Sequence, residues 1–549
     1  MSISLHWTLL AAPLLVPTVG AQVSARLIPN PDGLSAGLDA FRDVNGDGVR
    51  DFVSGAADAA IGALTRAGRV RLVSGADGVP LGNIAGTRAY GRLGATTRVI
   101  GDINGDGVPE IAVSEDRGGA GNAPARVYIH SGANLVRLRT HDFATYSISS
   151  IARLSDVDGD GVADYAVGAR TFSVTDHSFV KVFSGATGAE LRTFLPFMAP
   201  SGFGYSVIEL GDLNADGVPD LAIGDTTAFV AGSARGRVQV VSIASGATLL
   251  SIDGPAPEYA EFGAGLGAPG DINGDGAPDL IVASALRVRA YSGASGALLW
   301  GTPLLSDRWD AEVELVCPGD LDFDGVSEVL AYGRRFSDQP GNQIELSVRL
   351  LDGATGSSFL DVQSLADFGL YDQAWVAAGD LDGDGRPELA ANARVAGAFR
   401  LCILSFPWTG VACESLPNST GATGTLEVVG PFAVGSTSAS LAAGSLPPGV
   451  TTMFLVAPAI GAPIQPPGSE GRLCLSGGIG RFFGPGQVQT SSAGGTVQLT
   501  LDADALPQPT ATVAAVAGET WSFQAWHRDT GATGATSNLT NAAFAIVRP

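Results

Sequence analysis

Seven copies of one nine-residue acidic pattern, Asp-x-(Asn/Asp)-x-Asp-Gly-x-x-(Asp/Glu), constrain this chain more than any other feature. The copies begin at Asp43, Asp102, Asp156, Asp212, Asp271, Asp320 and Asp380, so successive starts lie 59, 54, 56, 59, 49 and 60 residues apart. After each copy comes a short apolar run, such as Tyr-Ala-Val-Gly at 165–168, which favours a buried strand over a helix. A repeat of this length predicts blades or stacked units.

The residue types of the pattern suit a hard divalent cation of calcium's size, which takes roughly six to eight oxygen ligands. Positions 1, 3, 5 and 9 supply side-chain oxygens, and position 7 would add a backbone carbonyl. Position 6 is always glycine, because a chain that curls around an ion needs φ values that a Cβ resists. Position 4 departs from glycine at Ala215 and Phe323, so the loops at Asp212 and Asp320 are expected to have the poorest geometry.

We therefore expect up to seven Ca²⁺ ions, one for each repeat. The candidate metal ligands are Asp43, Asn45, Asp47 and Asp51; Asp102, Asn104, Asp106 and Glu110; Asp156, Asp158, Asp160 and Asp164; Asp212, Asn214, Asp216 and Asp220; Asp271, Asn273, Asp275 and Asp279; Asp320, Asp322, Asp324 and Glu328; and Asp380, Asp382, Asp384 and Glu388.

Two other interpretations of the loops were weighed. Asp, Asn and Gly form tight turns without any metal, but three or four converging carboxylates repel one another unless a cation neutralises them. An EF-hand opens in the same way but needs a Glu at position 12 and two flanking helices. Position 12 here is Ser54, Val113, Val167, Ile223, Val282, Ala331 and Ala391, none of which has a carboxylate.

Each repeat has the same internal order of segments. An apolar segment, often opened by an aromatic-Gly pair (Tyr90-Gly91, Phe203-Gly204, Phe262-Gly263), leads into the acidic loop and the strand after it. A third strand then ends in Ser-Gly-Ala, and a fourth completes the unit. Seven such units predict an all-β fold, a seven-bladed β-propeller over residues 22–410. The last unit lacks a fourth strand, so we expect residues 23–28 to supply it and close the ring.

These residues resemble the FG-GAP repeats that build the propeller of integrin α subunits, and also the loop-bearing propellers of some fungal lectins. The resemblance covers about residues 22–407 and is strongest at Phe203-Gly204 and Phe262-Gly263, the latter followed by Gly-Ala-Pro-Gly at 267–270. It implies metal ligands at the loop positions given above, in loops that join the first and second strands of each blade. Integrin propellers load only some blades, whereas every repeat here has a loop.

The composition changes after about residue 411 to Gly, Ala, Ser, Thr and Pro, with alternating apolar strands. We expect a C-terminal β-sandwich module over 411–549. It resembles a module recurrent in secreted bacterial proteins through Asn-Ser-Thr-Gly at 418–421, Gly-Arg-Leu-Cys-Leu at 471–475 and residues 521–529. Trp521, Phe523 and Trp526 fit core packing better than sugar stacking. Four cysteines allow three pairings, of which Cys413 with Cys474 is preferred.

Charge and targeting signals bear on location and partners. The net charge of −23 comes largely from candidate metal ligands, because the seven loops hold 24 of the 55 acidic residues. No basic stripe is available for nucleic acid. Residues 1–21 predict a signal peptide with a small-residue cleavage site, although no Lys or Arg lies near Met1, and a retained anchor is the alternative. We expect a secreted, cell-surface or periplasmic protein with no membrane span after cleavage.

The search for catalytic residues found none. The histidines are scattered, and no zinc, nucleophile-elbow or phosphate-loop motif is present. Asp116, Arg117 and Asp176 were considered for a site, with surface ion pairs as the default interpretation. The leading hypothesis is a secreted calcium-binding propeller that binds a glycan or an extracellular protein, with structural metals. The alternatives are a polysaccharide-acting enzyme on the same scaffold and a structural spacer.

Overall fold

The computed structural model describes residues 24–29, 37–117, 124–144, 146–171, 177–198, 201–230, 232–256, 261–284, 287–304, 312–321, 325–336, 344–361, 375–381, 387–395, 398–405, 409–413, 415–517, 519–531 and 534–548. The expected signal peptide at 1–21 lies outside these residues. The chain divides into two compact units, one holding residues 25–319 and 326–404 and the other including 405–549. Every regular element described is a β-strand, so no helix there is long and apolar enough to cross a membrane.

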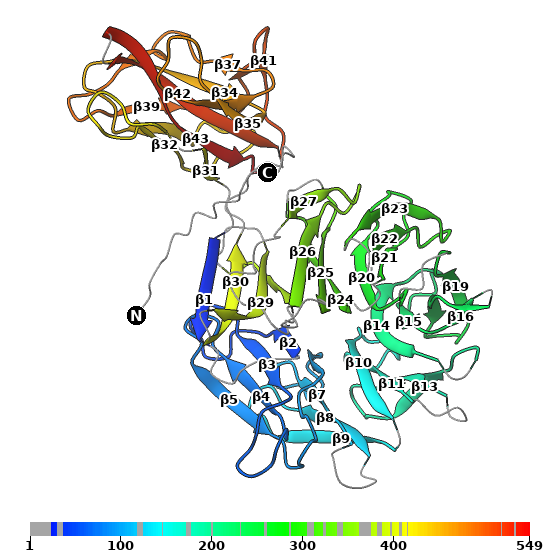
Figure 1. Ribbon diagram of the computed structural model, residues 1–549. Helices are drawn as coiled ribbons and strands as arrows, with labels where there is room; N and C mark the ends of the chain where they lie inside the picture. The colour runs from blue at the N-terminus through cyan, green and yellow to red at the C-terminus, as the bar shows by residue number, and fades with distance from the viewer. Residues whose placement is uncertain are drawn as a thin grey trace. The chain divides into compact units, whose positions relative to one another are not determined.

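The first unit consists of four-stranded antiparallel sheets, the blades, arranged around one centre (Figure 1). Blades 1 to 3 contain β2 (Gly37–Ala40), β3 (Phe52–Ala56), β4 (Arg69–Val73) and β5 (Pro80–Ala85); β6 (Thr97–Val99), β7 (Ile111–Glu115), β8 (Ala125–His130) and β9 (Arg137–Phe143); and β10 (Ser147–Arg153), β11 (Tyr165–Arg170), β12 (Phe179–Phe183) and β13 (Glu190–Phe194).

Blades 4 to 6 contain β14 (Phe203–Gly211), β15 (Asp220–Asp225), β18 (Arg237–Ser242) and β19 (Thr248–Asp253); β20 (Gly265–Gly270), β21 (Asp279–Ala283), β22 (Arg287–Tyr291) and β23 (Leu298–Pro303); and β24 (Glu312–Gly319), β25 (Glu328–Phe336), β26 (Ile344–Leu351) and β27 (Ser358–Asp361). A small hairpin, β16 (Phe229–Val230) with β17 (Ser233–Ala234), projects from blade 4.

Blade 7 combines the two ends of the propeller segment. Its strands are β28 (Trp375–Gly379), β29 (Glu388–Val395), β30 (Ala398–Ser405) and β1 (Ser24–Pro29), with β1 hydrogen-bonded to β30. The first strand of each blade contacts that of the next, and β28 contacts β2, so the ring is closed. The all-β propeller and the closure by the N-terminal strand are confirmed.

The hydrophobic core of this unit lies between neighbouring blades. Ile28 of β1, for example, packs in one cluster with Leu38 and Phe52 of blade 1 and Leu401 of blade 7. The second strands β3, β7 and β21 are buried along their whole length, because a blade covers each of their faces. This burial explains why the run after each acidic loop is continuously apolar rather than alternating.

The Phe-Gly pairs hold adjacent blades together. Phe203 is buried, and Gly204 adopts a φ of +79°, which favours glycine. The carbonyl oxygen of Gly204 lies so close to Gly168 of blade 3 that a Cβ on Gly168 would overlap it. The same arrangement recurs at Phe262-Gly263, so the motif marks a close approach of two backbones.

In blade 2 the equivalent contact is made by Gly94, which follows Leu93, and the Tyr90-Gly91 pair lies three residues earlier. Leu93 is buried and Gly94 has a φ of +90°, whereas Tyr90 is 48% exposed. The position before this glycine thus accepts an aliphatic side chain as well as an aromatic ring.

The second unit contains a six-stranded sheet and a three-stranded sheet that share one hydrophobic core. The larger has the order β31 (Thr409–Cys413), β43 (Gly534–Ile546), β42 (Thr520–Gly531), β34 (Thr451–Ala457) and β37 (Gly480–Arg481), with β38 (Gln489–Thr490) also paired to β34. The smaller contains β32 (Thr425–Val429), β33 (Ser440–Gly444) and β39 (Val497–Thr500). Two short pairs are β35 (Ala459–Ile464) with β36 (Leu473–Ser476) and β40 (Leu506–Pro507) with β41 (Thr512–Val513).

The three sequence motifs of this unit lie against one another. The backbone N–H of Ser419 donates to both carboxylate oxygens of Asp529, at 3.1 and 3.0 Å. The backbone N–H of Cys474 donates to Gln524 Oε1 at 3.0 Å. Trp521 and Phe523 lie in the core, which confirms the packing interpretation. The motifs therefore fasten loops of the module onto β42.

The cysteines agree with the preferred pairing. Cys474 is disulfide-bonded, whereas Cys317 and Cys402 are free thiols. Burial raises the pKa of both free thiols to about 12, so they remain protonated and unreactive at neutral pH.

Candidate metal centres

The acidic loops all connect the first strand of a blade to its second, as the loop at Asp156 does between β10 and β11. Because the strands run in the same sense in every blade, the loops open on one face of the propeller. Four of the candidate ligands, Asp322, Asp324, Asp382 and Asp384, lie outside the described residues.

The carboxylate at position 1 shapes each loop through backbone hydrogen bonds. Asp156 accepts the N–H groups of Gly159 and Gly161 at 2.8 and 2.7 Å, and the bond from Gly161 lowers the pKa of Asp156. The position-6 glycine makes the equivalent bond to Asp43, Asp102, Asp212, Asp271 and Asp320. These bonds are those of an Asx turn, so by themselves they do not require a metal.

The predicted need for glycine at position 6 is confirmed in the described loops. The φ angles there are +86° at Gly48, +82° at Gly107, +88° at Gly161, +86° at Gly217, +88° at Gly276 and +92° at Gly325, while Gly385 lies outside the described residues. At position 4 of the fourth loop, Ala215 is held at a φ of +58°, in a region that its Cβ disfavours. This loop folds as the others do but carries local backbone strain.

The carboxylate at position 9 is buried in every loop. Asp51, Glu110, Asp164, Asp220, Asp279, Glu328 and Glu388 are each at most 1% exposed. In six of these loops one carboxylate oxygen accepts the backbone N–H of position 2, for example Val157 to Asp164 at 2.8 Å. Several of these carboxylates accept further bonds, as Asp164 does from the backbone N–H of Gly185 at 2.7 Å. Neutral donors do not fully offset the free energy of moving a charge out of water, so a positive partner would stabilise these groups.

The raised pKa values of the position-9 carboxylates also favour a cation in these loops. Burial, with the nearby charges of Asp102 and Asp106, raises the pKa of Glu110 to about 7. Burial likewise raises the pKa of Asp220 to about 6 and raises that of Asp164. Without a cation these groups are driven towards protonation, whereas a bound cation would keep them ionised.

Two loops bring three carboxylates together. One ligand oxygen from each of Asp102, Asp106 and Glu110 lies within 4.8 Å of the others, and so do oxygens of Asp156, Asp158 and Asp164. In the fourth loop, Asp220 Oδ1 is buried and has no hydrogen-bond partner. Converging oxygens and an orphaned buried oxygen fit a hard divalent cation, so these acidic groups could hold a metal ion.

The Ser-Gly-Ala motif that ends the third strand of blades 1, 2, 3 and 5 belongs to the same site. In blade 3, Ser184 Oγ donates to Asp160 at 3.4 Å, and the backbone N–H of Gly185 donates to Asp164 at 2.7 Å. A Cβ on Gly185 would overlap the carbonyl oxygen of Ala163, which explains the glycine. Sequence reasoning used this motif only to end a strand, although its fixed place after each loop was a usable signal.

Blade 4 lacks the glycine of the Ser-Gly-Ala motif. Ser242 still donates to Asp216, at 3.2 Å, but Ile243 stands where the glycine would be. This is the blade in which Asp220 Oδ1 has lost its partner. In blades 1, 3 and 5 the glycine brings its N–H to the buried carboxylate.

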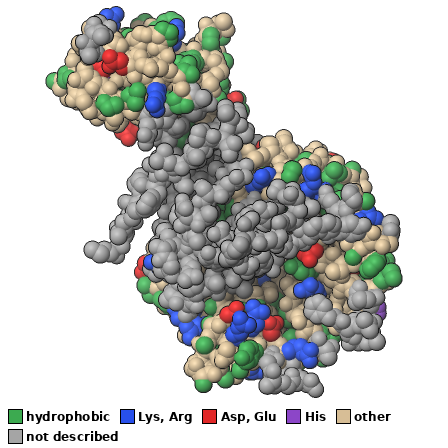
Figure 2. Space-filling model, viewed as in Figure 1, with side chains coloured by type: hydrophobic (Ala, Val, Ile, Leu, Met, Phe, Trp, Pro, Cys, Tyr) green, Lys and Arg blue, Asp and Glu red, His purple; other side chains and the backbone are tan. Residues whose placement is uncertain are grey.

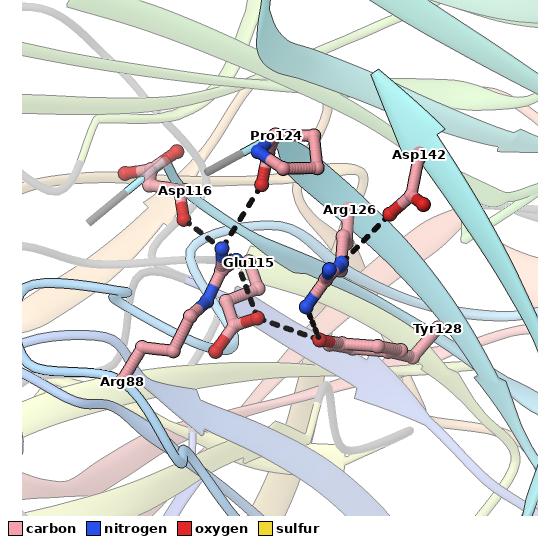
Figure 3. A network of polar contacts seen from close by, with 7 residues as sticks. All are labelled: Arg88, Glu115, Asp116, Pro124, Arg126, Tyr128 and Asp142. Carbon is pink, nitrogen blue, oxygen red and sulfur yellow. Dashed lines mark hydrogen bonds and ion pairs between the residues drawn. The ribbon is translucent and has the colours of Figure 1, made fainter. Parts of the chain in front are cut away.

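A polar network in blade 2 was also missed by sequence reasoning. Glu115, buried at the end of β7, pairs with Arg88 at 2.5 Å and accepts the hydroxyl of Tyr128 at 2.7 Å (Figure 3). Arg126 bonds Asp142 at 2.7 Å and contacts Tyr128 at 3.5 Å. A single buried Glu at the end of a strand gives no sequence signal.

Asp116 and Arg117, which were candidates for a further site, are half-buried rather than fully exposed, and burial raises the pKa of Asp116. Asp116 lies 3.8 Å from Arg92 in an ion pair, as the default interpretation expected. Asp176 lies outside the described residues.

Comparison with known proteins agrees with this geometry. The FG-GAP-like repeat family model matches residues 271–331. The chain is 30% identical to integrin alpha-V of Gallus gallus over 205 residues, which cover 34% of this chain and 19% of the relative. It is 33% identical to integrin alpha-IIb of Mus musculus over 178 residues, covering 29% of this chain and 17% of the relative. The chain thus spans less than a fifth of these relatives.

Among solved structures, BBS1N in complex with ARL6DN aligns with a TM-score of 0.42 and 12% identity, covering 69% of this chain and 94% of that one. That likeness is too weak to inform fold or function. The family match, the integrin relatives and the ring of loop-bearing blades agree with one another. The chain therefore carries an FG-GAP-like repeat and is similar, over about a third of its length, to integrin α subunits.

Proposed function

We propose that this protein is a secreted, calcium-stabilised propeller that binds an extracellular ligand, in the manner of an adhesion module. The observation that carries the proposal is the buried carboxylate at position 9 of every loop, which needs a positive partner inside the fold. Calcium suits the all-oxygen ligand set and accepts irregular geometry better than magnesium does. The ions, up to seven, would act structurally.

Each ion would clamp the turn between two strands and leave the opposite face free for a ligand. That face is formed by the loops between second and third strands and by the links between blades. The ligand would be a glycan or a protein rather than a nucleic acid. Figure 2 shows the described basic side chains of the visible propeller surface in small separate groups rather than in one stripe.

The contribution of the ions to stability would be large. At about 1 mM calcium and a dissociation constant of about 0.1 mM, one site contributes about 1.4 kcal/mol. Seven independent sites would contribute about 10 kcal/mol, which is comparable to the whole stability of a typical domain.

Thermal unfolding of the full chain in 1 mM CaCl₂, in 1 mM MgCl₂ and in EGTA tests the metal role, together with elemental analysis of the dialysed protein. We expect a higher Tm in calcium than in EGTA and a smaller effect of magnesium. Equal Tm values in calcium and EGTA would refute a structural role for calcium. A glycan array followed by product analysis separates binding from the enzymatic alternative, because only an enzyme would release shorter products.

A further inference from the structure

A groove of about 350 Å³ lies at the rim of the propeller, between blades 2 and 3, which are neighbours in Figure 1. One wall is the end of β9 and the residues after it, including His141, Asp142 and Tyr146. The other wall is β12, through Phe179, Lys181 and Phe183. None of the candidate metal ligands is among the residues that line the groove.

Aromatic rings line both walls of the groove. The rings of Tyr146 and Phe179 lie with centroids 4.7 Å apart, and those of His141 and Phe183 lie 4.2 Å apart. His141 Nε2 is hydrogen-bonded to the hydroxyl of Tyr165 at 2.8 Å, and burial lowers the pKa of His141 to about 4. At neutral pH His141 is thus an uncharged ring, and the groove presents a neutral aromatic surface.

Two charged groups of opposite sign also line the groove. Lys181, the only lysine in the chain, has its ammonium 5.2 Å from the Phe179 ring centroid and 2.6 Å from Glu190. Asp142 has a side chain that is 59% exposed. The groove therefore offers a hydrogen-bond donor and an acceptor next to apolar rings.

The network of Figure 3 positions the acceptor. Arg126 holds Asp142 at 2.7 Å and is itself in contact with Tyr128, whose hydroxyl bonds the buried Glu115. Glu115 is fixed in turn by Arg88 at 2.5 Å. Burying such a charge is unfavourable unless it is well paired. Here the buried pair supports a chain of contacts that ends at an exposed carboxylate on the groove.

We propose that this groove binds one pyranose ring of a saccharide. A pyranose has an apolar C–H face, which would pack on the ring of Tyr146, and hydroxyls that both donate and accept hydrogen bonds. Asp142 would accept from two hydroxyls, and Lys181 would donate to a third. The proposal rests on the proposed function as a ligand-binding propeller and names the ligand class and the site.

The test starts with a glycan array probed with the full chain in 1 mM CaCl₂. The glycan that binds best is then titrated by calorimetry against wild type and the variants Asp142→Asn, Tyr146→Ala and Lys181→Met. We expect each variant to weaken the affinity at least tenfold with an unchanged Tm.

The matched control is Asp253→Asn. Asp253 pairs with Arg237 at 2.6 Å in blade 4, as Asp142 pairs with Arg126 in blade 2, with the same spacing along the chain. Its loss should leave the affinity unchanged.

The outcomes separate the two proposals. Glycan binding that survives Asp142→Asn and Tyr146→Ala would overturn the groove site but keep the ligand-binding function. Binding only to a protein or peptide would overturn the saccharide and also keep that function. No binding to any probe, together with no effect of EGTA on Tm, would overturn both.

Discussion

Replacing Glu110 by glutamine should stabilise the calcium-free protein, although it removes a hydrogen-bonded buried group. Burial raises the pKa of this carboxyl from 4.5 to about 7, so its ionised form destabilises the fold increasingly from pH 4.5 to about 7 and fully above that. A shift of this size corresponds to about 3 kcal/mol at pH 8. The glutamine side chain would keep an oxygen to accept the Ile103 N–H, so we expect Glu110→Gln to recover about 1–3 kcal/mol in EGTA.

Calcium should change the difference in stability between the wild type and the Glu110→Gln variant. The variant lacks one anionic ligand, so it loses the contribution of one site, about 1.4 kcal/mol at ten times the dissociation constant and about 2.7 kcal/mol at a hundred times. The stabilisation seen in EGTA should therefore shrink steadily as calcium rises.

The best assay is hydrogen–deuterium exchange of β7, which follows this loop directly and is buried along its length. Its opening free energy reports on the loop itself, whereas the two units of the chain complicate a single unfolding transition. The matched control is Glu115→Gln, a buried carboxylate in the same blade that is paired with Arg88 rather than placed in a loop. It should destabilise β7 equally with and without calcium.

Two results would contradict this reasoning. If Glu110→Gln destabilises β7 in EGTA, the hydrogen bonds of the carboxylate outweigh its desolvation. If the variant keeps the full calcium response of the wild type, Glu110 is not a ligand.

Three further outcomes are expected. Gly185→Ala should destabilise blade 3 by about 1–3 kcal/mol and weaken its calcium response, because the added Cβ overlaps the Ala163 carbonyl. Hydrogen–deuterium exchange of β11 measures this effect. Gly494→Ala is the neutral control, because its Cβ would meet nothing nearer than Ser492 Oγ at 3.7 Å. Ile28→Ala should lower the free energy of unfolding by about 2–4 kcal/mol, because Ile28 is 2% exposed in the closing blade. The control Leu195→Ala, at a residue that is 59% exposed, should lower it by less than about 0.5 kcal/mol. If Ile28→Ala lowers the Tm no more than Leu195→Ala does, closure by β1 is wrong. Burial lowers the pKa of His141 from 6.5 to about 4, so this side chain protonates more readily in the unfolded chain. The free energy of unfolding of the wild type should therefore fall by about 1–3 kcal/mol between pH 6.5 and pH 4 and stay constant above pH 6.5. A pH profile of stability that matches that of His141→Gln would show that His141 is not buried as a neutral ring.

Much of the fold followed from signals that are local in sequence. The acidic loops shape themselves through bonds that span at most seven residues, such as Asp156 with Gly161 and Val157 with Asp164, so their form is encoded locally in the sequence. The apolar runs after them are buried from both sides, which sequence shows directly. The period of the loops then predicted repeated blades and a propeller closed by the N-terminal strand.

What sequence could not supply lies between segments that are distant along the chain. Gly185 meets Asp164 from another strand, Leu93 replaces an aromatic residue because only its burial matters, and the groove exists only where β9 of one blade faces β12 of the next. Sequence by itself thus determined the loops and the repeated strand order, because turn geometry and strand burial are set by neighbouring residues. The tertiary structure decided which serines, glycines and rings meet across strands and blades, because those contacts depend on packing that no local pattern records.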